Sequence, residues 1–174
     1  MPDSAAAAIR PMCPEEVDAV AAVSRAADGM FGEAGLVLPP DDPREMLAAA
    51  RWVLVADGPP VRGLAAAGVL DGAAHLEELA VHPDHGRRGV GGALLEAACA
   101  RARAEGFAVM TLTTFRDVAW NAPWYARRGF GELAPADWGP QLRAQWQREE
   151  EAGIVVAPRI AMRRPLTASG AAPG

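Results

Sequence analysis

The stretch HPDHGRRGVGGALLEAA, residues 82–98, places glycines immediately before an alanine- and leucine-rich segment. Glycine has the most backbone freedom to lose on folding, so it weakens the interior of a helix or strand. Glycines gathered at the beginning of a helix therefore indicate that bare backbone must approach something closely. Free amides there lie at the positive end of the helix dipole and bind anions. The stretch predicts an anion site formed by Gly89, Gly91 and Gly92.

Two arginines strengthen this interpretation. Arg87 and Arg88 would add positive charge and forked hydrogen-bond donors beside the free amides. Two familiar glycine-rich phosphate sites do not fit. Counted from Gly89, the last glycine of GxGxxG falls on Leu94, and the chain has no lysine for a Walker sequence. A phosphate-binding turn of a third type remains.

The segments around the turn predict the local topology. Three strand-like runs separated by the turn signals DGPP and DG lie upstream, at 52–56, 62–70 and 74–81. Downstream, we expect a helix at about 90–105, ended by Gly106, and a strand at 107–115. An antiparallel meander followed by a strand, glycine turn, helix and strand predicts a βαβ unit with one parallel pair.

The N-terminal part is expected to contain a strand at 7–12 and then a helix beginning at Pro14. Val17, Val20 and Val23 would form the buried stripe of this helix. The following segment, 28–43, is rich in Gly, Pro and Asp and predicts a long loop, with a short helix at 44–50 after it.

The C-terminal part predicts a short helix in NAPWYARRGF, with Asn121 as its N-cap and Gly129 as its stop, and Phe130 packing back on it. An amphipathic helix in GPQLRAQWQREEEAG and a last strand in VVAPRIAMRRPL follow. We expect one domain over residues 1–165 and a disordered tail over 166–174.

Composition excludes several classes of function. The 174 residues carry a formal net charge of -5, and every basic residue is an arginine, so nucleic acid is not the expected partner. No apolar run reaches the roughly 18 residues of a membrane span, and the N-terminus does not resemble a secretory signal. Cys13 and Cys99 form no disulfide framework or metal-ligand spacing, and His82 and His85 are expected to be turn residues. We therefore expect a cytoplasmic protein without a metal.

Two motifs resemble a known family. LAVHPDHGRRGVGGALL resembles motif A of the GNAT superfamily of N-acetyltransferases, whose pyrophosphate-binding segment reads Gln/Arg-x-x-Gly-x-Gly/Ala. Gly89 and Gly91 match its small positions, whereas Gly86 stands where the family has Gln or Arg. WYARRGF is similar to the family's Tyr-x-x-x-Gly-Phe element, and the order of elements agrees over about residues 7–165.

The resemblance implies an α/β (α+β) fold. Its mixed, mostly antiparallel central sheet would carry helices on both faces and splay between the fourth and fifth strands to admit acetyl-CoA. The pantetheine would lie along the fourth strand as an added strand does. The resemblance implies that the acetyl-CoA site comprises Leu79, Ala80, Val81, Arg87, Arg88, Gly89, Val90, Gly91, Gly92 and Asn121. One strand amide would stabilise the developing oxyanion.

The resemblance also assigns acid and base candidates. Tyr125, the only tyrosine, would be the general acid that protonates the departing thiolate, with packing beneath the cosubstrate as the alternative. Because side chains alternate along a strand, His75 and Glu77 should share one face with Leu79, and Glu78 should face the other way unless a bulge intervenes. We favour Glu77 as base, with His75 as relay or substitute, and Glu78 is the alternative. Either carboxylate could instead be solvated or paired with an arginine.

Other residues near the motifs allow two interpretations, a structural role or a binding role. We expect Arg127 and Arg128 to interact favourably with the C-terminal end of a helix dipole, and we consider contact with a CoA phosphate the weaker alternative. Asn121 is first a cap and second a pantetheine contact. Aromatic and basic side chains after the fifth strand could line an acceptor pocket or pack in the core: Phe115, Arg116, Trp120 and Trp124.

The predicted function is direct transfer of an acetyl group from acetyl-CoA to a primary amine, on a small molecule or a peptide, in a ternary complex. Segments 28–43 and 141–151 are expected to shape the amine pocket. The alternative is a non-catalytic acyl-CoA-binding sensor or regulatory module, which Gly86 permits. GNAT proteins are often dimers, so a homodimer is an open alternative to a monomer.

Overall fold

The computed structural model describes residues 7–166, which form one seven-stranded sheet with helices on both faces. The strands are β1 (Ile9–Pro11), β2 (Trp52–Ala56), β3 (Gly63–Leu70), β4 (Ala73–Val81), β5 (Val109–Phe115), β6 (Gly131–Leu133) and β7 (Arg159–Pro165). The helices are α1 (Val17–Glu33), α2 (Pro43–Ala49), α3 (Val90–Ala104), α4 (Ala122–Ala126) and α5 (Pro140–Glu151). Short 3-10 turns lie at Pro14–Glu16, Pro83–His85 and Pro135–Asp137.

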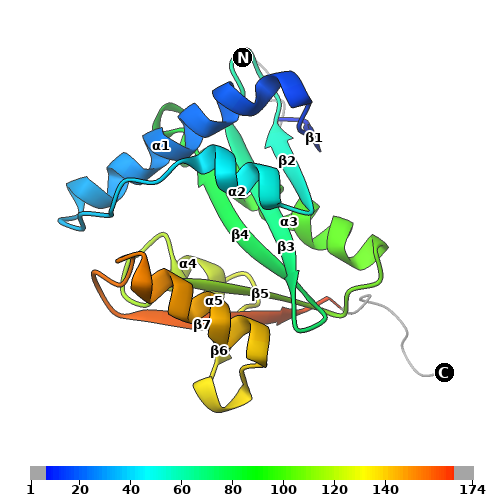
Figure 1. Ribbon diagram of the computed structural model, residues 1–174. Helices are drawn as coiled ribbons and strands as arrows, with labels where there is room; N and C mark the ends of the chain where they lie inside the picture. The colour runs from blue at the N-terminus through cyan, green and yellow to red at the C-terminus, as the bar shows by residue number, and fades with distance from the viewer. Residues whose placement is uncertain (1–6, 167–174) are drawn as a thin grey trace.

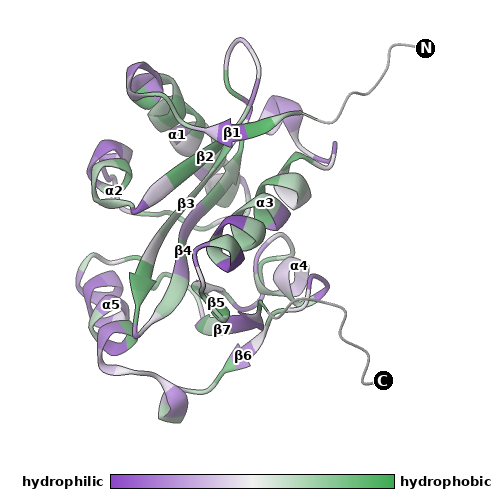
Figure 2. Cartoon of the chain, turned by 90° about the vertical axis from the view of Figure 1, so that its right-hand side faces the viewer, coloured by the Kyte–Doolittle hydropathy of each residue, from purple (hydrophilic) through white to green (hydrophobic). Residues whose placement is uncertain are grey.

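The helices form two layers, one on each side of the sheet. Helices α1, α2 and α5 lie on one side and α3 and α4 on the other (Figure 2). Alternating strand residues fill both interfaces. Leu76, Leu94 and Met110 belong to the core on the α3 side, whereas Val20 and Leu64 belong to the core beneath α1 and α2.

The strand order is β1-β2-β3-β4-β5-β7-β6, and β4 with β5 is its parallel pair. This pair is short, because only Ala74↔Met110 and His75↔Thr111 are in register. Beyond these residues β4 continues to Val81 without a partner on its β5 side. Figure 1 shows β5 and β7 turning away from β3 and β4. The sheet is therefore split between its fourth and fifth strands, as expected.

A β-bulge interrupts the antiparallel pairing of β3 and β4. Ala66 pairs with Glu78 and Ala67 pairs with Leu76, which leaves Glu77 as the extra residue. A bulge breaks the alternation of side chains along a strand. As a result, Leu76 lies in the α3 core, and both Glu77 and Glu78 lie on the opposite face, which carries α1 and α5.

Several predicted boundaries differ from the structure. Residues 28–33, expected in a loop, continue α1 to Glu33. Phe31 explains this extension, because its ring packs 5.5 Å from Phe115 and 5.7 Å from Trp120, between ring centroids. Tertiary contacts of this kind override the low helix propensity of Gly29 and Gly32.

At the C-terminal end, β6 was not predicted, because three residues are too short to give a strand pattern. The last strand begins at Arg159, later than the expected residue 155. The expected tail lies outside the described residues, apart from the buried Leu166. Within residues 7–166, no helix combines the length and apolar character that crossing a membrane requires.

Candidate active site

The glycine turn exposes backbone amides at the beginning of α3. Gly89 is the N-cap residue, with a left-handed φ of 79°, and no side chain caps the helix. The first backbone bond of the helix runs from the Ala93 amide to the Gly89 carbonyl, 3.0 Å away. Within the described chain, the amides of residues 87–92 donate to no protein acceptor. The region therefore has the free donors that an anion site needs.

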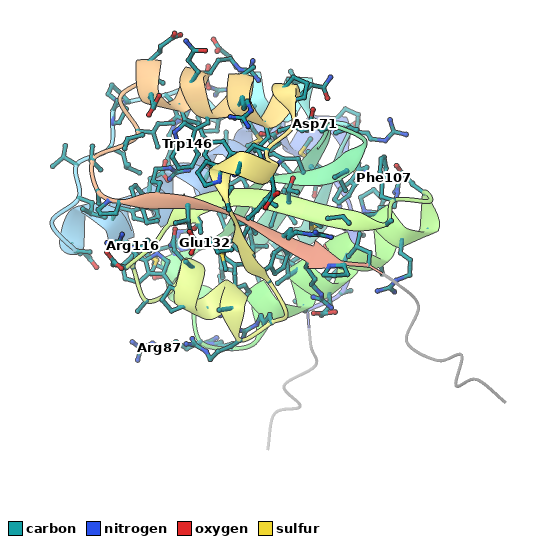
Figure 3. The ribbon with its side chains drawn as sticks, turned by 90° about the horizontal axis from the view of Figure 1, so that it is seen from below. Asp71, Arg87, Phe107, Arg116, Glu132 and Trp146 are labelled. Carbon is teal, nitrogen blue, oxygen red and sulfur yellow. The ribbon has the colours of Figure 1, made fainter. Side chains whose placement is uncertain are left out.

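Space and charge at this helix end also suit a phosphate group. A Cβ added to Gly89 would have no neighbour within 4 Å, so the turn is open on this side. Arg87 and Arg88 are exposed, and Figure 3 shows the Arg87 side chain pointing away from the fold. Arg87 has a φ of 60°, a left-handed conformation that is uncommon for a residue with a Cβ.

Trp124 and Arg128 lie beside the same helix end. The Arg128 guanidinium carbon lies 3.7 Å from the centroid of the Trp124 ring, and the Trp124 ring lies 3.6 Å from a Cβ placed on Gly91. Arg128, which follows the C-cap of α4, also donates to the Trp124 carbonyl of that helix at 3.2 Å. Arg128 therefore has the helix-terminal contact that the sequence favours, and it also places a cation next to Gly92. Arg127 is exposed.

The free edge of β4 continues the site away from the glycine turn. Apart from the bulged Glu77, residues 76–81 pair with β3, and none of them makes a ladder bond with β5. Leu79 and Val81 are half-buried against the α3 core, and Ala80 is buried beneath α1. Every second backbone unit of this edge is available to a ligand lying in an extended conformation.

Glu78 lies on the part of β4 that has no β5 partner, and it contacts α1. Its Oε1 accepts a hydrogen bond of 2.6 Å from the Ser24 hydroxyl, and Ser24 is 2 % exposed. Burial raises the pKa of Glu78 to about 7, although the hydrogen bond from Ser24 acts in the opposite direction and lowers this pKa. The carboxylates of Asp28 and Asp41 raise this pKa further. Glu78 therefore changes protonation near neutral pH.

Glu77 points to the same face but toward α5. Glu77 is exposed, and its Oε1 lies over Gly68, 3.0 Å from the position that a Cβ on this glycine would occupy. Desolvation of the carboxylate and the charge of Glu149 raise the pKa of Glu77, and Arg148 lowers it. The expected separation of the two glutamates onto opposite faces does not hold, because the bulge turns Glu78 to the face of Glu77. Leu79, expected beside Glu77, faces α3 instead.

His75 is buried in the same face, at the point where β4 and β5 still pair. It is 1 % exposed, and its Nδ1 lies 2.8 Å from the Thr111 Oγ1. Burial lowers the pKa of His75 to about 4, so the ring is neutral at pH 7. These contacts suit a structural link between β4 and β5 better than a proton relay.

Tyr125 approaches the split from α4. Its ring packs edge-on against Trp124 and Phe130, at centroid distances of 5.1 and 5.5 Å, and the residue is 9 % exposed. Its hydroxyl bonds to no other residue in the described part of the chain. Burial, and then the charge of Glu78, raise the pKa of the phenol. The charge of the titrating Glu78 carboxylate thus acts on the protonated phenol across the split.

Comparison with known proteins identifies this arrangement. The model of the acetyltransferase (GNAT) family matches residues 21–130, which include β4, the glycine turn, α3 and the Tyr125 helix. The chain belongs to the GNAT acetyltransferase family. The sequence-based recognition and the predicted fold class are therefore confirmed.

Solved structures share this GNAT fold at low sequence identity. The ribosomal-protein-S18-alanine N-acetyltransferase of Escherichia coli is 19% identical, with a TM-score of 0.66, over 94% of this chain and 96% of that one. A GNAT acetyltransferase of Staphylococcus aureus is 14% identical, with a TM-score of 0.72, over 93% of this chain and 100% of that one. The N-acetylglutamate synthase of Neisseria gonorrhoeae, solved with coenzyme A and N-acetyl-glutamate, is 20% identical, with a TM-score of 0.68. The match covers 92% of this chain and 35% of the synthase.

The sequence predicts that the Asn121 side chain caps helix α4, but in the structure this side chain makes no capping hydrogen bond. It occupies the N-cap position, but its Oδ1 accepts from the Thr114 hydroxyl at 2.7 Å and from the Phe115 amide at 3.4 Å. The side chain turns back to the end of β5 because Thr114 offers a buried donor there. Asn121 therefore links the end of β5 to the beginning of α4, the helix that carries Tyr125.

Two hollows lie around the end of α1 and the loop that follows it. One, of about 310 Å³, is lined by apolar groups that include Phe115 and Trp120. The other, of about 460 Å³, is lined by the end of α1 and the following loop, with Asp28 and Asp41 in its wall. Leu36 borders both hollows. Of the expected pocket residues, Arg116 instead pairs with its neighbour Asp117, and Trp124 lies beside α3.

Helix α5 borders the same face on the other side. The Thr113 hydroxyl donates to Glu149 at 2.7 Å, and Arg159 lies 3.6 Å from the same carboxylate. Asp71, in the turn after β3, accepts from the Gln141 and Leu142 amides at 2.9 Å each and so caps α5 from another element (Figure 3). Sequence reasoning missed this cap, because nothing in the local pattern of α5 reveals a partner 70 residues away.

Sequence reasoning also missed Ser24 and Asp28. Ser24 occupies the buried stripe of α1 with Val20 and Val23, and a serine in such a stripe is a usable signal for a buried polar partner. Asp28 follows one helical turn later. Because the sequence predicts a loop at 28–43, the position of Asp28 on the face of Ser24 could not be predicted.

Proposed function

We propose that this GNAT protein transfers an acetyl group from acetyl-CoA to a primary amine, directly within a ternary complex, with Glu78 as the base and Tyr125 as the acid. The observation that carries the proposal is the position of these two groups. A carboxylate that titrates near neutrality and a phenol that bonds to none of residues 7–166 flank the same strand edge, which has no β5 partner. That combination matches the proton requirements of acyl transfer to an amine.

The residues around the glycine turn fit the phosphates of CoA. Donors are available on the amides of Val90, Gly91 and Gly92, and arginines 87, 88 and 128 lie around them. Pantetheine amides would pair with the free edge at Leu79–Val81, as an added strand would. One of these strand amides would donate to the thioester carbonyl and stabilise the oxyanion. The neighbouring synthase that was solved with coenzyme A supports this choice of cosubstrate.

Glu78 would remove a proton from the incoming amine. An alkyl ammonium has a reference pKa near 10, so at neutral pH it must lose a proton before it can attack. A base whose pKa lies near 7 suits this step, since general bases work best near the operating pH. Glu77 is exposed and directed to α5, and His75 is neutral and bonded to Thr111, so both serve this step less well.

Tyr125 would serve the leaving group. The raised pKa keeps the phenol protonated, so its proton is available when the C–S bond breaks. One ammonium proton passes to Glu78 and on to solvent. The nitrogen loses a second proton as the C–N bond forms. This proton restores the Tyr125 phenol, which has given its own proton to the departing thiolate.

The amine would enter from the α1 face. The hollow with Asp28 and Asp41 in its wall lies between the end of α1 and the following loop, and the charges of both carboxylates act on Glu78. Burial and Asp41 raise the pKa of Asp28 to about 6, so the Asp28 carboxyl is predominantly ionised at pH 7. Negative charge at this entrance favours a cationic acceptor over a neutral or anionic one.

Calorimetric titration with acetyl-CoA and with dephospho-CoA tests the cosubstrate, and thiol release over a panel of amines in the same buffer tests the transfer. We expect acetyl-CoA to bind and at least one cationic amine to release thiol. Absence of binding would contradict the assignment of the glycine turn. Binding without release on any amine would favour a non-catalytic acyl-CoA sensor, which the unusual Gly86 allows.

A further inference from the structure

Ser24 makes an uncommon contact for a serine inside a helix. Such hydroxyls usually face solvent or bond to the carbonyl one turn earlier in their own helix. The Ser24 hydroxyl instead crosses from α1 to β4 and donates to Glu78 Oε1 at 2.6 Å. The residue is 2 % exposed, so water does not compete for this bond. The distance lies in the range of a charge-assisted hydrogen bond to a carboxylate.

We propose that Ser24 is a positioning residue for the acetyl transfer: it fixes the Glu78 carboxylate at the split and leaves Oε2 to receive the amine proton. The inference rests on the proposed function, in which Glu78 is the base. Of the two carboxylate oxygens, Oε1 is bonded by Ser24, and Oε2 makes no hydrogen bond to residues 7–166. One oxygen is thus held while the other stays open.

The bulge in β4 explains why this side chain needs a tether. The bulge leaves Glu77 unpaired and turns Glu78 to the α1 face, where the regular alternation of the strand no longer dictates its direction. A glutamate side chain has several rotatable bonds, and ordering them costs conformational entropy. A hydrogen bond from a buried helix residue selects one rotamer before the substrate binds, which is the preorganisation that a base requires.

The charges around Glu78 make Ser24 the contact that favours the ionised carboxylate. The titratable groups that face Glu78 are Asp28 on α1, Asp41 in the loop before α2 and Tyr125 on α4. Both aspartates disfavour a further negative charge, and so does burial. Among the contacts of residues 7–166, the hydrogen bond from Ser24 is the one that lowers the pKa of Glu78. Its loss should therefore leave Glu78 protonated at neutral pH.

The test is the pH profile of kcat for Ser24→Ala. We expect the acidic limb of the profile to move to a higher pH by about one unit. At pH values below this limb, kcat of Ser24→Ala should be roughly tenfold lower than that of wild type, and at alkaline pH the two should be equal. The KM for acetyl-CoA should not change, since Ser24 lies on the other side of the sheet from α3. Val20→Ala is the matched control: it also removes buried atoms from α1, and its profile should keep the wild-type limb.

The double variant Ser24→Ala/Glu78→Gln distinguishes positioning from a general structural effect. If Ser24 acts through Glu78, removing it should have no further effect on kcat once the carboxylate is gone. An unmoved acidic limb in a folded Ser24→Ala protein, or an equal loss of kcat in both backgrounds, would overturn the inference.

A measurement without turnover separates this inference from the proposed function. The loss of unfolding free energy caused by Ser24→Ala should be larger at pH 8 than at pH 5, because the bond is stronger to an ionised carboxylate. This pH dependence should vanish in the Glu78→Gln background, where the side chain carries no charge at either pH. If the coupling is found but the wild-type protein transfers acetyl to no amine, the proposed function fails and the role of Ser24 in it fails too. If transfer occurs and the coupling is absent, only the inference about Ser24 fails.

Discussion

Glu78 on β4 and Tyr125 on α4 lie on the two sides of the split sheet, and the Glu78 carboxylate contributes to the raised pKa of the Tyr125 phenol. The two groups therefore share one local environment although 47 residues separate them in sequence, from 78 to 125. The glycine turn, the free β4 edge and both side chains meet there.

Tyr125→Phe removes the phenolic proton and keeps the ring between Trp124 and Phe130. We expect kcat to fall about 100-fold, within the usual range for loss of an acid catalyst, with acetyl-CoA affinity nearly unchanged. Steady-state kinetics and calorimetry measure the two effects. Unaltered turnover would exclude Tyr125 as the acid.

Glu78→Gln should change how stability depends on pH. The folded protein keeps the Glu78 proton up to about pH 7, whereas the unfolded chain loses it near 4.5, so the native carboxylate costs stability as the pH rises between these values. Glutamine has no such cost. The stability of Glu78→Gln relative to wild type should therefore increase by about 2–3 kcal/mol across this window.

Urea denaturation at about pH 4.5, 5.5 and 7.5 measures this difference, because these values span the titration of the carboxyl group in both states. Glu132→Gln, on the exposed strand β6, is the control and should differ from wild type by the same small amount at each pH (Figure 3). A pH-independent difference for Glu78→Gln would show that the carboxylate is ordinarily solvated.

Exchanging the residues at 86 and 87, as Gly86→Arg/Arg87→Gly, tests the phosphate-binding turn. The exchange removes a side chain from a left-handed backbone position and should raise the free energy of unfolding by about 1 kcal/mol. Gly86 has an extended backbone, and a Cβ there would meet its nearest atom, the Pro83 carbonyl oxygen, at 3.4 Å, so arginine fits. The pair then also matches the family's Gln/Arg position.

We expect the exchanged protein to bind acetyl-CoA at least as tightly as wild type, whereas Arg87→Gly alone should bind more weakly because it loses a positive charge. Calorimetry compares the three proteins. Equal affinity of wild type and Arg87→Gly would mean that Arg87 does not contact the phosphates.

Asp71→Ala removes the cap that the β3–β4 turn gives to α5. The Asp71 carboxylate accepts from the Gln141 and Leu142 amides, so its loss should destabilise the fold by about 1–2 kcal/mol, as loss of an N-cap does. Glu151→Ala, at the other end of α5, is the matched control and should change stability little. Equal effects of the two substitutions in urea denaturation would contradict a capping role.

Much of the fold followed from local sequence patterns. The glycines at 89, 91 and 92 predict the turn and α3, and the DG signal at 71–72 predicts the β3–β4 hairpin, because these features depend on backbone conformations that few residues adopt. The end of α1 could not be predicted, since Phe31 gains its contacts from Phe115 and Trp120, which are distant in sequence.

The candidate site was harder to predict than the fold. The sequence limits the base to His75, Glu77 or Glu78, but the choice among them depends on the register of β4 against β3. A one-residue bulge at Glu77 changes which glutamate reaches α1, and pairing between strands determines it rather than local composition. The side-chain bond of Asn121 likewise depends on Thr114 of a neighbouring element.

The central claim is that Glu78 is the base of an acetyl transfer at the split in the sheet, and the pH profile of kcat for wild type, Glu78→Gln and Glu77→Gln tests it most directly. We predict an acidic limb near pH 7 in wild type and Glu77→Gln, and a loss of about 100-fold or more in kcat for Glu78→Gln with acetyl-CoA binding retained. A limb that persists in Glu78→Gln and disappears in Glu77→Gln would contradict the account and assign the base to Glu77.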